Sequence, residues 1–305
     1  MTSFFESDHL MAEPASQEGR RNPDPLCVLC DRRMRLAVPP DGLWRFYRCC
    51  RCGYWTSRAA NGNWPYCDYS DAPDYTSSIK DWGVITDDVT VVLKHKFQLL
   101  HKEGPNGLMV DVGCSEGAYV EAARQLGWRA VGFEVDHAKL QRARLKGLDC
   151  RGVEQLAECG VSLRADVVML RHVVEHIPDF VSTLKSAAAG VAPGGVLWVE
   201  VPNQLFYRLF GLTRRVKGGR YLGALYPPSH IHAFEPNAVW RLGDLIGLRC
   251  ERLVSYAPAD KRWMPRYLWT GRRLKAVAHQ ILAGIGCGES MAAVYRKAGN
   301  PQGLC

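Results

Sequence analysis

Apolar and polar positions alternate in blocks along the middle of the chain, and these blocks predict strands and helices in turn. Short apolar runs are typical of buried strands, and apolar residues three or four positions apart are typical of amphipathic helices. The predicted strands are Leu108–Val112, Arg129–Glu134, Asp166–Leu170, Val196–Val201, Leu248–Tyr256 and Ser290–Arg296. The predicted helices are Thr86–Leu100, Gly117–Leu126, Asp136–Lys146 and Asp179–Gly190. This alternation predicts an α/β fold, an open and mostly parallel sheet with helices on both faces.

The remaining segments have different compositions and suggest domain boundaries. Residues 1–25, rich in Glu, Pro, Ser and Arg, are expected to be a mobile leader. Residues 26–60 contain paired cysteines and are expected to form a small metal-binding domain, and residues 61–105 an aromatic, acidic linker followed by a helix. Residues 106–298 then form the main domain.

Four of the twelve cysteines have the spacing of a zinc ribbon. The two Cys-x2-Cys pairs are Cys27 with Cys30 and Cys49 with Cys52. Four thiolates can hold one zinc ion tetrahedrally, and such a closed shell is structural rather than catalytic. The ion could contribute roughly 10–16 kcal/mol to a segment too small to fold by burial alone. Cys50 is an alternative to Cys49 and Cys67 a more distant one, and disulfides are disfavoured in a reducing compartment.

The expected cellular location of the protein and the distribution of charge along the chain indicate which class of molecule it binds. No apolar run approaches the roughly 18 residues of a membrane-spanning helix, and the N-terminal residues lack the pattern of a secretory signal, so a cytoplasmic location is expected. Residues 201–305 carry 16 basic and 5 acidic side chains, whereas residues 71–200 carry 14 and 18. This asymmetry indicates an anionic partner of the last third, with a merely solvated face as the alternative.

A glycine-containing turn follows the first strand of the main domain. Gly113 permits a sharp turn, and Gly117 lets the next helix begin close beneath a ligand. Asp111 supplies an acceptor at the strand end, and Glu134 ends the next strand, 23 residues later. A carboxylate at that place can bind the ribose hydroxyls of a nucleoside. The combination indicates a nucleoside-containing cofactor.

These residues resemble the cofactor loop of class I S-adenosylmethionine-dependent methyltransferases. The resemblance rests on DVGCSEG followed by GFEVD, on ADVVMLRHVVEHIPD and APGGVLWVEVPN as the fourth and fifth strands, and on PPSHIHAFEPNAVWRLGDLIGL before a late helix. It covers about residues 75–298 and implies a Rossmann-like, seven-stranded, mostly parallel sheet. The ribbon in front, ending in RCCRCGYW, is similar to a bacterial branch whose members modify sugars, cell-envelope glycans or secondary metabolites.

The resemblance also implies roles for individual residues. Those expected to hold S-adenosylmethionine are Asp111, Gly113, Ser115 and Gly117 at the methionine part, Glu134 at the ribose, Val135, Val153 and Glu154 at the adenine, and Arg171 at the mouth of the site. A nicotinamide dehydrogenase is the competing class, but it needs glycine where Ser115 stands, and Glu116 would repel a pyrophosphate. An acidic loop suits a sulfonium cation and an ammonium group instead.

Histidines supply the candidates for acid–base chemistry. His172 follows the fourth strand, where an imidazole could take the proton of an acceptor hydroxyl. His230 lies with His232 in a proline-rich segment expected to close over the acceptor, and these two could also form a second metal site. His176 is expected to brace a helix. We favour His172 as the base, because a strand end holds a side chain more firmly than a loop.

The basic last third combines arginines with aromatic residues. An insertion at about residues 203–235 includes the basic run Phe206–Lys217, and Lys261–Trp269 and Arg272–Lys275 follow it. Such clusters could clamp a diphosphate, stack on bases or contact an anionic bilayer. We predict methyl transfer to a small-molecule or glycan acceptor, a sugar hydroxyl on an anionic, phosphate-bearing or lipid-linked substrate. The alternatives are an RNA methyltransferase and a non-catalytic partner subunit that binds S-adenosylmethionine.

Overall fold

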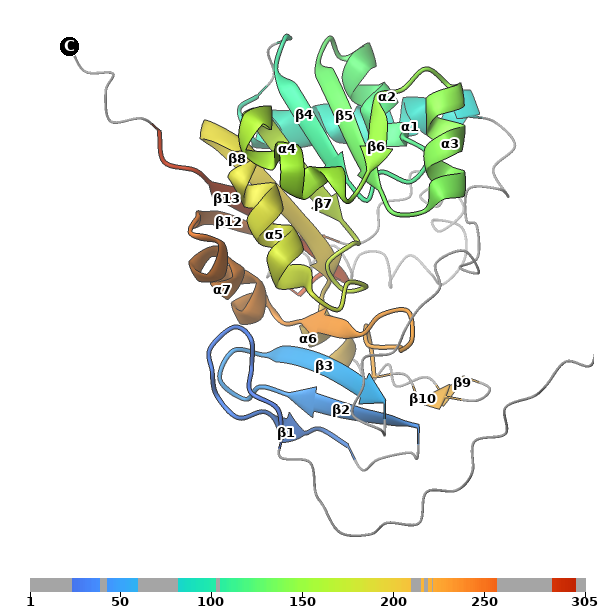
Figure 1. Cartoon of the computed structure of the whole chain (residues 1–305). Coiled ribbons are helices and arrows are strands. Elements are labelled where there is room, and N and C mark those ends of the chain that lie inside the picture. Colours follow the sequence, from blue (N-terminus) through green and yellow to red (C-terminus); the bar gives the residue numbers. More distant parts are fainter. Residues whose placement is uncertain are drawn as a thin grey trace, which may run out of the picture.

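A seven-stranded sheet forms the centre of the computed structural model (Figure 1). The structure describes residues 24–38, 43–59, 82–102, 105–209, 215–216, 219–220, 222–256 and 287–299. The strands run in the order β12-β13-β8-β7-β4-β5-β6. Their bounds are β4 Leu108–Val112, β5 Arg129–Glu134, β6 Cys150–Gly152, β7 Ala165–Arg171, β8 Val191–Pro202, β12 Arg249–Tyr256 and β13 Ser290–Arg296. The pairs from β8 to β6 are parallel, and β13 is antiparallel to both β8 and β12. The predicted Rossmann-like sheet is confirmed.

Helices cover both faces of this sheet, as the sequence predicts. They are α1 Trp82–Leu99, α2 Ala118–Gln125, α3 His137–Leu145, α4 Gln155–Leu163, α5 Phe180–Ala189, α6 Gln204–Leu209 and α7 Pro236–Ile246. The core on one face, shared with α1, α2 and α3, contains Met109, Met169 and Trp198. Their chain neighbours Val110 and Leu170 belong to the core on the other face, shared with α4, α5 and α7. This alternation follows from the two-residue period of a strand, whose successive side chains point to opposite faces.

Local sequence explains where two of the helices begin. The side chain of Asp136 accepts hydrogen bonds from the backbone of Ala138 and Lys139 and so caps α3. Asp179 caps α5 in the same way, by accepting from the backbone of Ser182. Such caps satisfy backbone donors that the first helical turn leaves without partners.

The strand predicted to begin at Val196 starts five residues earlier. Pro193–Gly195 lies inside β8, which begins at Val191 rather than Val196. Gly194 donates its backbone N–H to Lys297, and Lys297 donates to Gly195. These bonds continue the ladder beyond the end of β13, so a tertiary partner extends the strand through a sequence that favours a turn locally.

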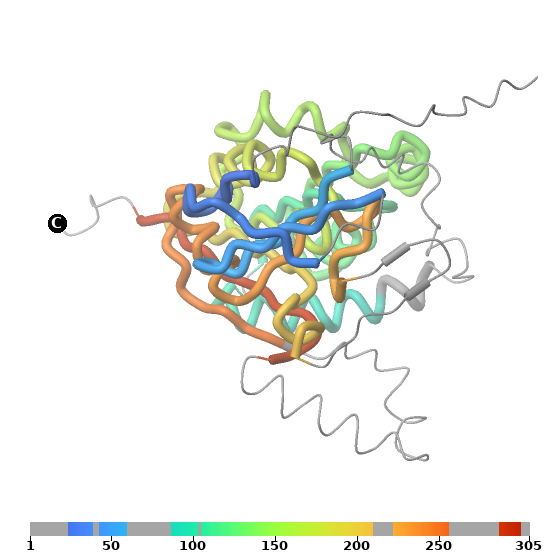
Figure 2. The backbone as a smooth tube through the Cα atoms, turned by 90° about the horizontal axis from the view of Figure 1, so that it is seen from below, coloured from blue at the N-terminus to red at the C-terminus, as the bar shows by residue number. Residues whose placement is uncertain are grey.

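The cysteine-rich segment forms a second sheet that includes a strand of the main domain. Its order is β1-β2-β3-β11, and the bounds are β1 Arg35–Leu36, β2 Trp44–Arg48, β3 Tyr54–Ala59 and β11 His232–Phe234. β11 pairs antiparallel with β3, aligning His232 with Thr56. Seen from below, the blue strands of this segment lie against the orange part of the chain that contains β11 (Figure 2). We call β1, β2 and β3 with their cysteine turns the ribbon.

β9 Arg215–Val216 and β10 Gly219–Arg220 form a short antiparallel pair inside the basic insertion. Among the helices that the structure describes, none combines the length and apolar character needed to cross a membrane.

Candidate functional site

The loop after β4 adopts backbone conformations that require its glycines. Gly113, Ser115 and Gly117 all have positive φ, at 77°, 51° and 86°. A Cβ atom at Gly113 would lie 2.3 Å from the side chain of Val173, and one at Gly117 would lie 2.5 Å from Leu148. Only glycine fits these two places without a shift of the neighbouring side chains. The loop is therefore a tight, preformed turn at the carboxyl edge of the sheet.

Glu134 holds this loop against the end of β5. Its Oε2 accepts a hydrogen bond from the backbone N–H of Ser115 at 2.7 Å, and its Oε1 accepts from Val135 at 2.9 Å and Asp136 at 3.0 Å. A carboxylate has about four acceptor positions. Three backbone donors fix the orientation of Glu134, and acceptor capacity remains for a hydroxyl of a ligand.

Asp111 lies buried at the end of β4, beside the same loop. Burial, and to a lesser extent the carboxylate of Glu134, raises the pKa of Asp111, which is about 7 with all neighbouring groups included. The positive charges of Arg171 and Lys96 act in the opposite direction. A buried carboxyl with this pKa is poised to ionise when a cation binds next to it.

The other residues expected around the cofactor lie at the same edge of the sheet. Val135 is 56% exposed directly after Glu134, so its side chain presents an apolar surface to solvent. Val153 follows β6 and donates its backbone N–H to the carbonyl oxygen of Glu134 at 3.1 Å. Glu154 is exposed at the start of α4. The structure thus brings the expected residues from three neighbouring strands to one place.

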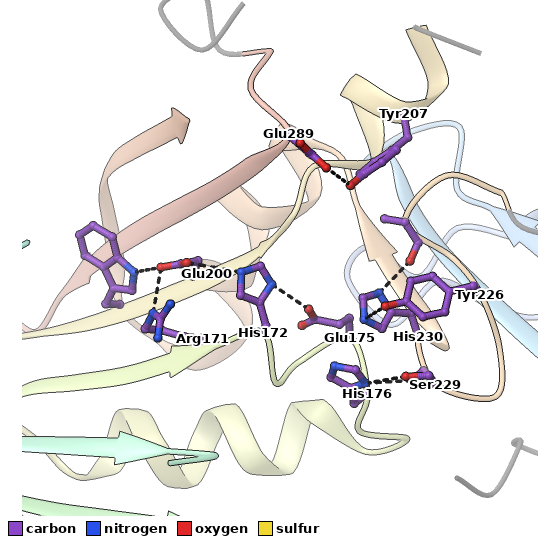
Figure 3. Close-up of polar contacts among 12 residues, drawn as sticks. Arg171, His172, Glu175, His176, Glu200, Tyr207, Tyr226, Ser229, His230 and Glu289 are labelled. Atoms are coloured by element: carbon purple, nitrogen blue, oxygen red, sulfur yellow. Dashed lines mark hydrogen bonds and ion pairs between the residues drawn. The ribbon is translucent and has the colours of Figure 1, made fainter. Parts of the chain in front are cut away.

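A buried carboxylate that the sequence analysis did not single out organises the next part of the site (Figure 3). Oε2 of Glu200, in β8, accepts hydrogen bonds from Lys96 at 2.5 Å, Trp198 at 3.1 Å and Arg171 at 3.4 Å. Its Oε1 lies 3.4 Å from Nε2 of His172. Burial alone would raise the pKa of Glu200, but the charges of Arg171, His172 and Lys96 hold it well below its usual value. A glutamate inside an apolar strand is the sequence signal that could have found it.

Arg171 ends β7, His172 follows it, and the two side chains face different partners. The guanidinium of Arg171 lies 3.9 Å from the ring centroid of Tyr119 and pairs with Glu200. The side chain of His172 is 41% exposed, and its Nδ1 lies 3.3 Å from Oε1 of Glu175. Burial would lower the pKa of His172, but the hydrogen bonds to Glu175 and Glu200 outweigh it and raise the pKa to about 9. At neutral pH the imidazole is therefore mainly protonated.

His230 and His232 point to different groups, although the chain separates them by a single residue. Nδ1 of His230 lies 2.9 Å from the carbonyl oxygen of Ala224, and its Nε2 lies 2.6 Å from the hydroxyl of Tyr226. Nδ1 of His232 lies 2.7 Å from the hydroxyl of Tyr54, in the ribbon. Within the described ranges, His230 is grouped with Glu175 and His176 rather than with His232.

The four predicted ribbon cysteines converge on one point. The Sγ atoms of Cys27, Cys30, Cys49 and Cys52 all lie within 4.8 Å of one another. Cys50, the alternative to Cys49, is exposed. Cys67, together with the basic clusters Lys261–Trp269 and Arg272–Lys275, lies outside the described residues.

The ribbon is bonded to the segment that carries His230. The backbone N–H of Ser57 donates to the carbonyl oxygen of Ile231 at 2.9 Å, and Ile231 in turn donates to the carbonyl oxygen of Glu175 at 2.9 Å. Next to them, Oε1 of Glu235 accepts from Arg48 and from Trp55, each at 3.0 Å. Neighbouring backbone and side-chain bonds therefore connect the ribbon to the histidine side of the site.

Comparison with known proteins places this geometry in a family. Residues 88–253 match the profile of a family described as "Methyltransferase domain", which covers more than half of the chain. The ubiquinone biosynthesis O-methyltransferase of Stutzerimonas stutzeri is 27% identical over 164 residues, or 48% of this chain and 70% of that protein. The protein of the same name from Pseudomonas paraeruginosa is 29% identical over 164 residues, with the same shares covered.

Solved structures show similar folds at low sequence identity. An S-adenosylmethionine-dependent methyltransferase from Mesorhizobium loti has a TM-score of 0.49 and 14% identity, covering 67% of this chain and 96% of that one. One from Archaeoglobus fulgidus has a TM-score of 0.48 and 14% identity, covering 70% of this chain and 94% of that one.

Proposed function

The chain belongs to the methyltransferase-domain family, and we propose that it transfers the methyl group of S-adenosylmethionine to a hydroxyl of an anionic small-molecule or glycan acceptor. Methyl transfer from S-adenosylmethionine follows from the family, and the acceptor is our proposal. The observation that carries it is the position of the exposed His172, which directly follows β7, the strand next to β4 and its glycine-containing loop. A sugar hydroxyl is the acceptor that we favour.

The loop after β4 and the carboxyl groups of Asp111 and Glu134 support the proposed position of the cofactor. We propose that Asp111 and the loop residues Gly113, Ser115 and Gly117 surround the methionine part, where the carboxylate of Asp111 faces the positive charges. Glu134 would accept a ribose hydroxyl with its remaining capacity. The exposed side chain of Val135 would lie against the adenine. We also propose that Val153 and Glu154 lie at the edge of the adenine and Arg171 at the mouth of the site.

The acceptor side is where proton transfer would occur. The acceptor oxygen forms a bond to the methyl carbon as the carbon–sulfur bond breaks, and the hydroxyl proton goes to a base. We propose the neutral imidazole of His172 as this base, because its side chain is exposed whereas His230 is buried with both ring nitrogens hydrogen-bonded. Because the pKa of His172 is about 9, the neutral imidazole is the minor form at neutral pH, and the transfer rate is expected to rise as the pH approaches 9. Glu175 and Glu200 would stabilise the imidazolium that forms. His230 would contribute by shaping the pocket.

The charge of the last third and the resemblance to known methyltransferases both support the proposed acceptor, an anionic sugar. Residues 201–305 carry 16 basic and 5 acidic side chains, which favours an anionic substrate. The curated relatives above are named as O-methyltransferases, which supports oxygen as the methylated atom. The preference for a sugar comes from the resemblance to ribbon-containing methyltransferases. We expect the enzyme to act in the cytoplasm. A lipid-linked substrate would require contact with the membrane surface, and fractionation of the labelled products tests this.

We also propose a structural zinc ion in the ribbon. With Zn–S bonds of about 2.3 Å, tetrahedral coordination separates the sulfur atoms by about 3.8 Å. The Sγ atoms of Cys27 and Cys52 are 3.5 Å apart, as are those of Cys30 and Cys49, so the four thiolates fit the ion. Four thiolates would complete its coordination, which leaves no position for a substrate.

The acceptor class can be tested by incubating the protein with methyl-labelled S-adenosylmethionine and an extract of the producing cells. Separation into nucleic acid, lipid, glycan and small-molecule fractions is expected to place the label in a glycan, lipid-linked or small-molecule fraction. Label in nucleic acid, with steep salt dependence, would favour RNA methylation instead. Absence of label from every fraction would favour a non-catalytic partner subunit. Glu134→Ala provides the control with impaired cofactor binding.

A further inference from the structure

We infer that Glu175, His176 and His230 form a second metal site, which binds a divalent transition-metal ion and is distinct from the four-cysteine cluster. One ligand atom from each of the three side chains lies within 4.8 Å of the other two. Glu175 and His176 follow β7, whereas His230 comes from the segment before β11 (Figure 3). Two parts of the chain about 55 residues apart thus bring two imidazoles and a carboxylate together.

Glu175 supplies the observation that points most directly to a ligand. The residue is 1% exposed, and its Oε2 has no hydrogen-bond partner within the described part of the chain. Its Oε1 is oriented by Nδ1 of His172 at 3.3 Å. A buried carboxylate oxygen without a donor is costly, because it has lost its water and received nothing in exchange. A cation next to Oε2 would remove that cost.

Both histidines are oriented as metal ligands usually are. Nδ1 of His176 lies 3.0 Å from the carbonyl oxygen of Ser229, and Nδ1 of His230 lies 2.9 Å from that of Ala224. A carbonyl oxygen can only accept, so each Nδ1 carries the hydrogen and each Nε2 carries the lone pair. Imidazoles that bind metals are typically held by such a bond from the other ring nitrogen. The two rings are 4.4 Å apart and perpendicular, at 89°.

The hydroxyl of Tyr226 occupies the lone pair of Nε2 of His230. This hydroxyl lies 2.6 Å from Nε2 of His230 and donates to it. An ion at this nitrogen would displace the hydroxyl, which is replaceable because it is a hydrogen-bond donor and not a part of the ligand set. Tyr226→Phe therefore keeps all three ligands and serves as a matched variant.

The ligand set determines which ions are expected. Two imidazoles suit zinc, iron or cobalt better than magnesium or calcium, which prefer oxygen ligands throughout. Three protein ligands also leave a coordination position open, unlike the closed shell of four cysteines. Glu175 also contacts His172, so the metal site lies on the proposed acceptor side. The inference does not depend on the identity of the acceptor.

Metal content provides a test that is independent of activity. Metal-free full-length protein is loaded with Zn²⁺, passed over a desalting column and analysed for zinc, and the loading is repeated with Co²⁺ to record absorption. We expect about two zinc ions per wild-type chain, and about one in Glu175→Gln, His176→Gln and His230→Gln. The cobalt–thiolate absorption of the four-cysteine cluster should remain in all three variants, which shows that they are folded.

Two variants serve as controls. His137→Gln removes an exposed histidine of α3, and Tyr226→Phe removes the competing hydroxyl, so both should retain about two zinc ions. Wild-type protein that binds one zinc ion with its cysteine cluster saturated would overturn the inference. The same follows if the three ligand variants retain the second ion, or if Tyr226→Phe loses it as they do. None of these outcomes changes the conclusion on methyl transfer.

Discussion

The hydroxyl of Tyr54 lies 2.7 Å from Nδ1 of His232 and joins the ribbon to the histidine side of the site. Nε2 of the same imidazole lies 3.1 Å from the carbonyl oxygen of Ile177, in the segment after β7. His232 therefore bridges two elements, and both of its ring nitrogens are used in doing so. Tyr54 follows Cys52 by two residues and begins β3, which pairs with β11. A folded cysteine cluster therefore holds β3 in place, and β3 in turn positions β11 and its His232.

Loss of the ribbon zinc is expected to impair transfer more than cofactor binding. Cys52→Ser removes a buried ligand, so the ribbon should lose its ion and the support that it gives to β11. We expect a lower melting temperature, a transfer rate reduced by roughly tenfold or more, and an unchanged dissociation constant for S-adenosylmethionine. Elemental analysis, thermal unfolding and calorimetry measure the three quantities.

Cys50→Ser is the matched control, because Cys50 is two residues away, exposed and outside the cluster. It should behave like the wild type in all three measurements. Equal zinc content in the two variants would argue against the assignment of the four ligands.

Glu134→Ala is expected to weaken S-adenosylmethionine binding by about 1.5–3 kcal/mol, the usual contribution of a hydrogen bond to a charged group. This corresponds to roughly a 10- to 150-fold increase in the dissociation constant, measured by calorimetry. Glu158→Ala, which changes an exposed carboxylate of α4, should leave the affinity unchanged. Unchanged affinity in Glu134→Ala would mean that the carboxylate only shapes the loop. Tight binding of a nicotinamide nucleotide would overturn the assignment of the cofactor.

The buried carboxyl of Asp111 predicts a pH dependence of stability in the cofactor-free protein. Its pKa of about 7 in the folded state exceeds the ordinary 3.8, so the folded chain binds the proton more tightly than the unfolded chain. The resulting stabilisation is complete below about pH 4 and is lost as the pH rises through 7. Asp111→Asn cannot ionise and should be more stable than the wild type at pH 8, by a few kcal/mol. Urea unfolding at pH 5 and pH 8 measures the difference, which should be smaller at pH 5 than at pH 8.

The same carboxyl predicts that cofactor binding releases a proton. A sulfonium and an ammonium group next to Asp111 favour its ionised form, as Arg171 and Lys96 already do, while Glu134 and Glu200 oppose it. The affinity of the wild type should therefore increase from pH 5 to pH 7. Calorimetry at pH 6.5 in two buffers of different ionisation enthalpy measures the released proton. A pH-independent affinity in the wild type would show that Asp111 does not face the cofactor.

His172→Ala is expected to lower the transfer rate by about 10²–10⁴-fold if His172 takes the hydroxyl proton. The affinity for S-adenosylmethionine should stay nearly unchanged, because His172 is assigned to the acceptor. Turnover and binding are measured on the same preparation, with His230→Ala alongside and His137→Ala as the exposed control. Joint loss of binding and turnover would indicate a structural histidine. Full activity in both His172→Ala and His230→Ala would mean that transfer proceeds by positioning alone.

Short-range patterns in the chain were sufficient to predict most of the sheet and the glycine-containing turn after β4. The bounds of β4, β5 and β13 match the predicted ones, because a short run of apolar residues directly indicates a buried strand. The strand β6 was not predicted from periodicity, because three residues are too few to show a pattern. Helices α4 and α7 were not predicted from periodicity either, although α7 is amphipathic. The grouping of the four ribbon cysteines was also predicted from their spacing, because the two cysteines of each Cys-x2-Cys pair are close in sequence as well as in space.

Contacts between groups from distant parts of the chain could be identified only in the tertiary structure. Glu200 contacts Lys96, Arg171 and His172, which come from two other segments of the chain, and the low pKa of Glu200 depends on these contacts. The pairing of β3 with β11 joins residues more than 170 positions apart, and no local pattern records such a partner. His230 meets Glu175 rather than His232 because the backbone between β10 and β11 turns each side chain to a different neighbour. Sequence periodicity determines which face of an element is buried, whereas only the packed fold determines which polar groups meet there.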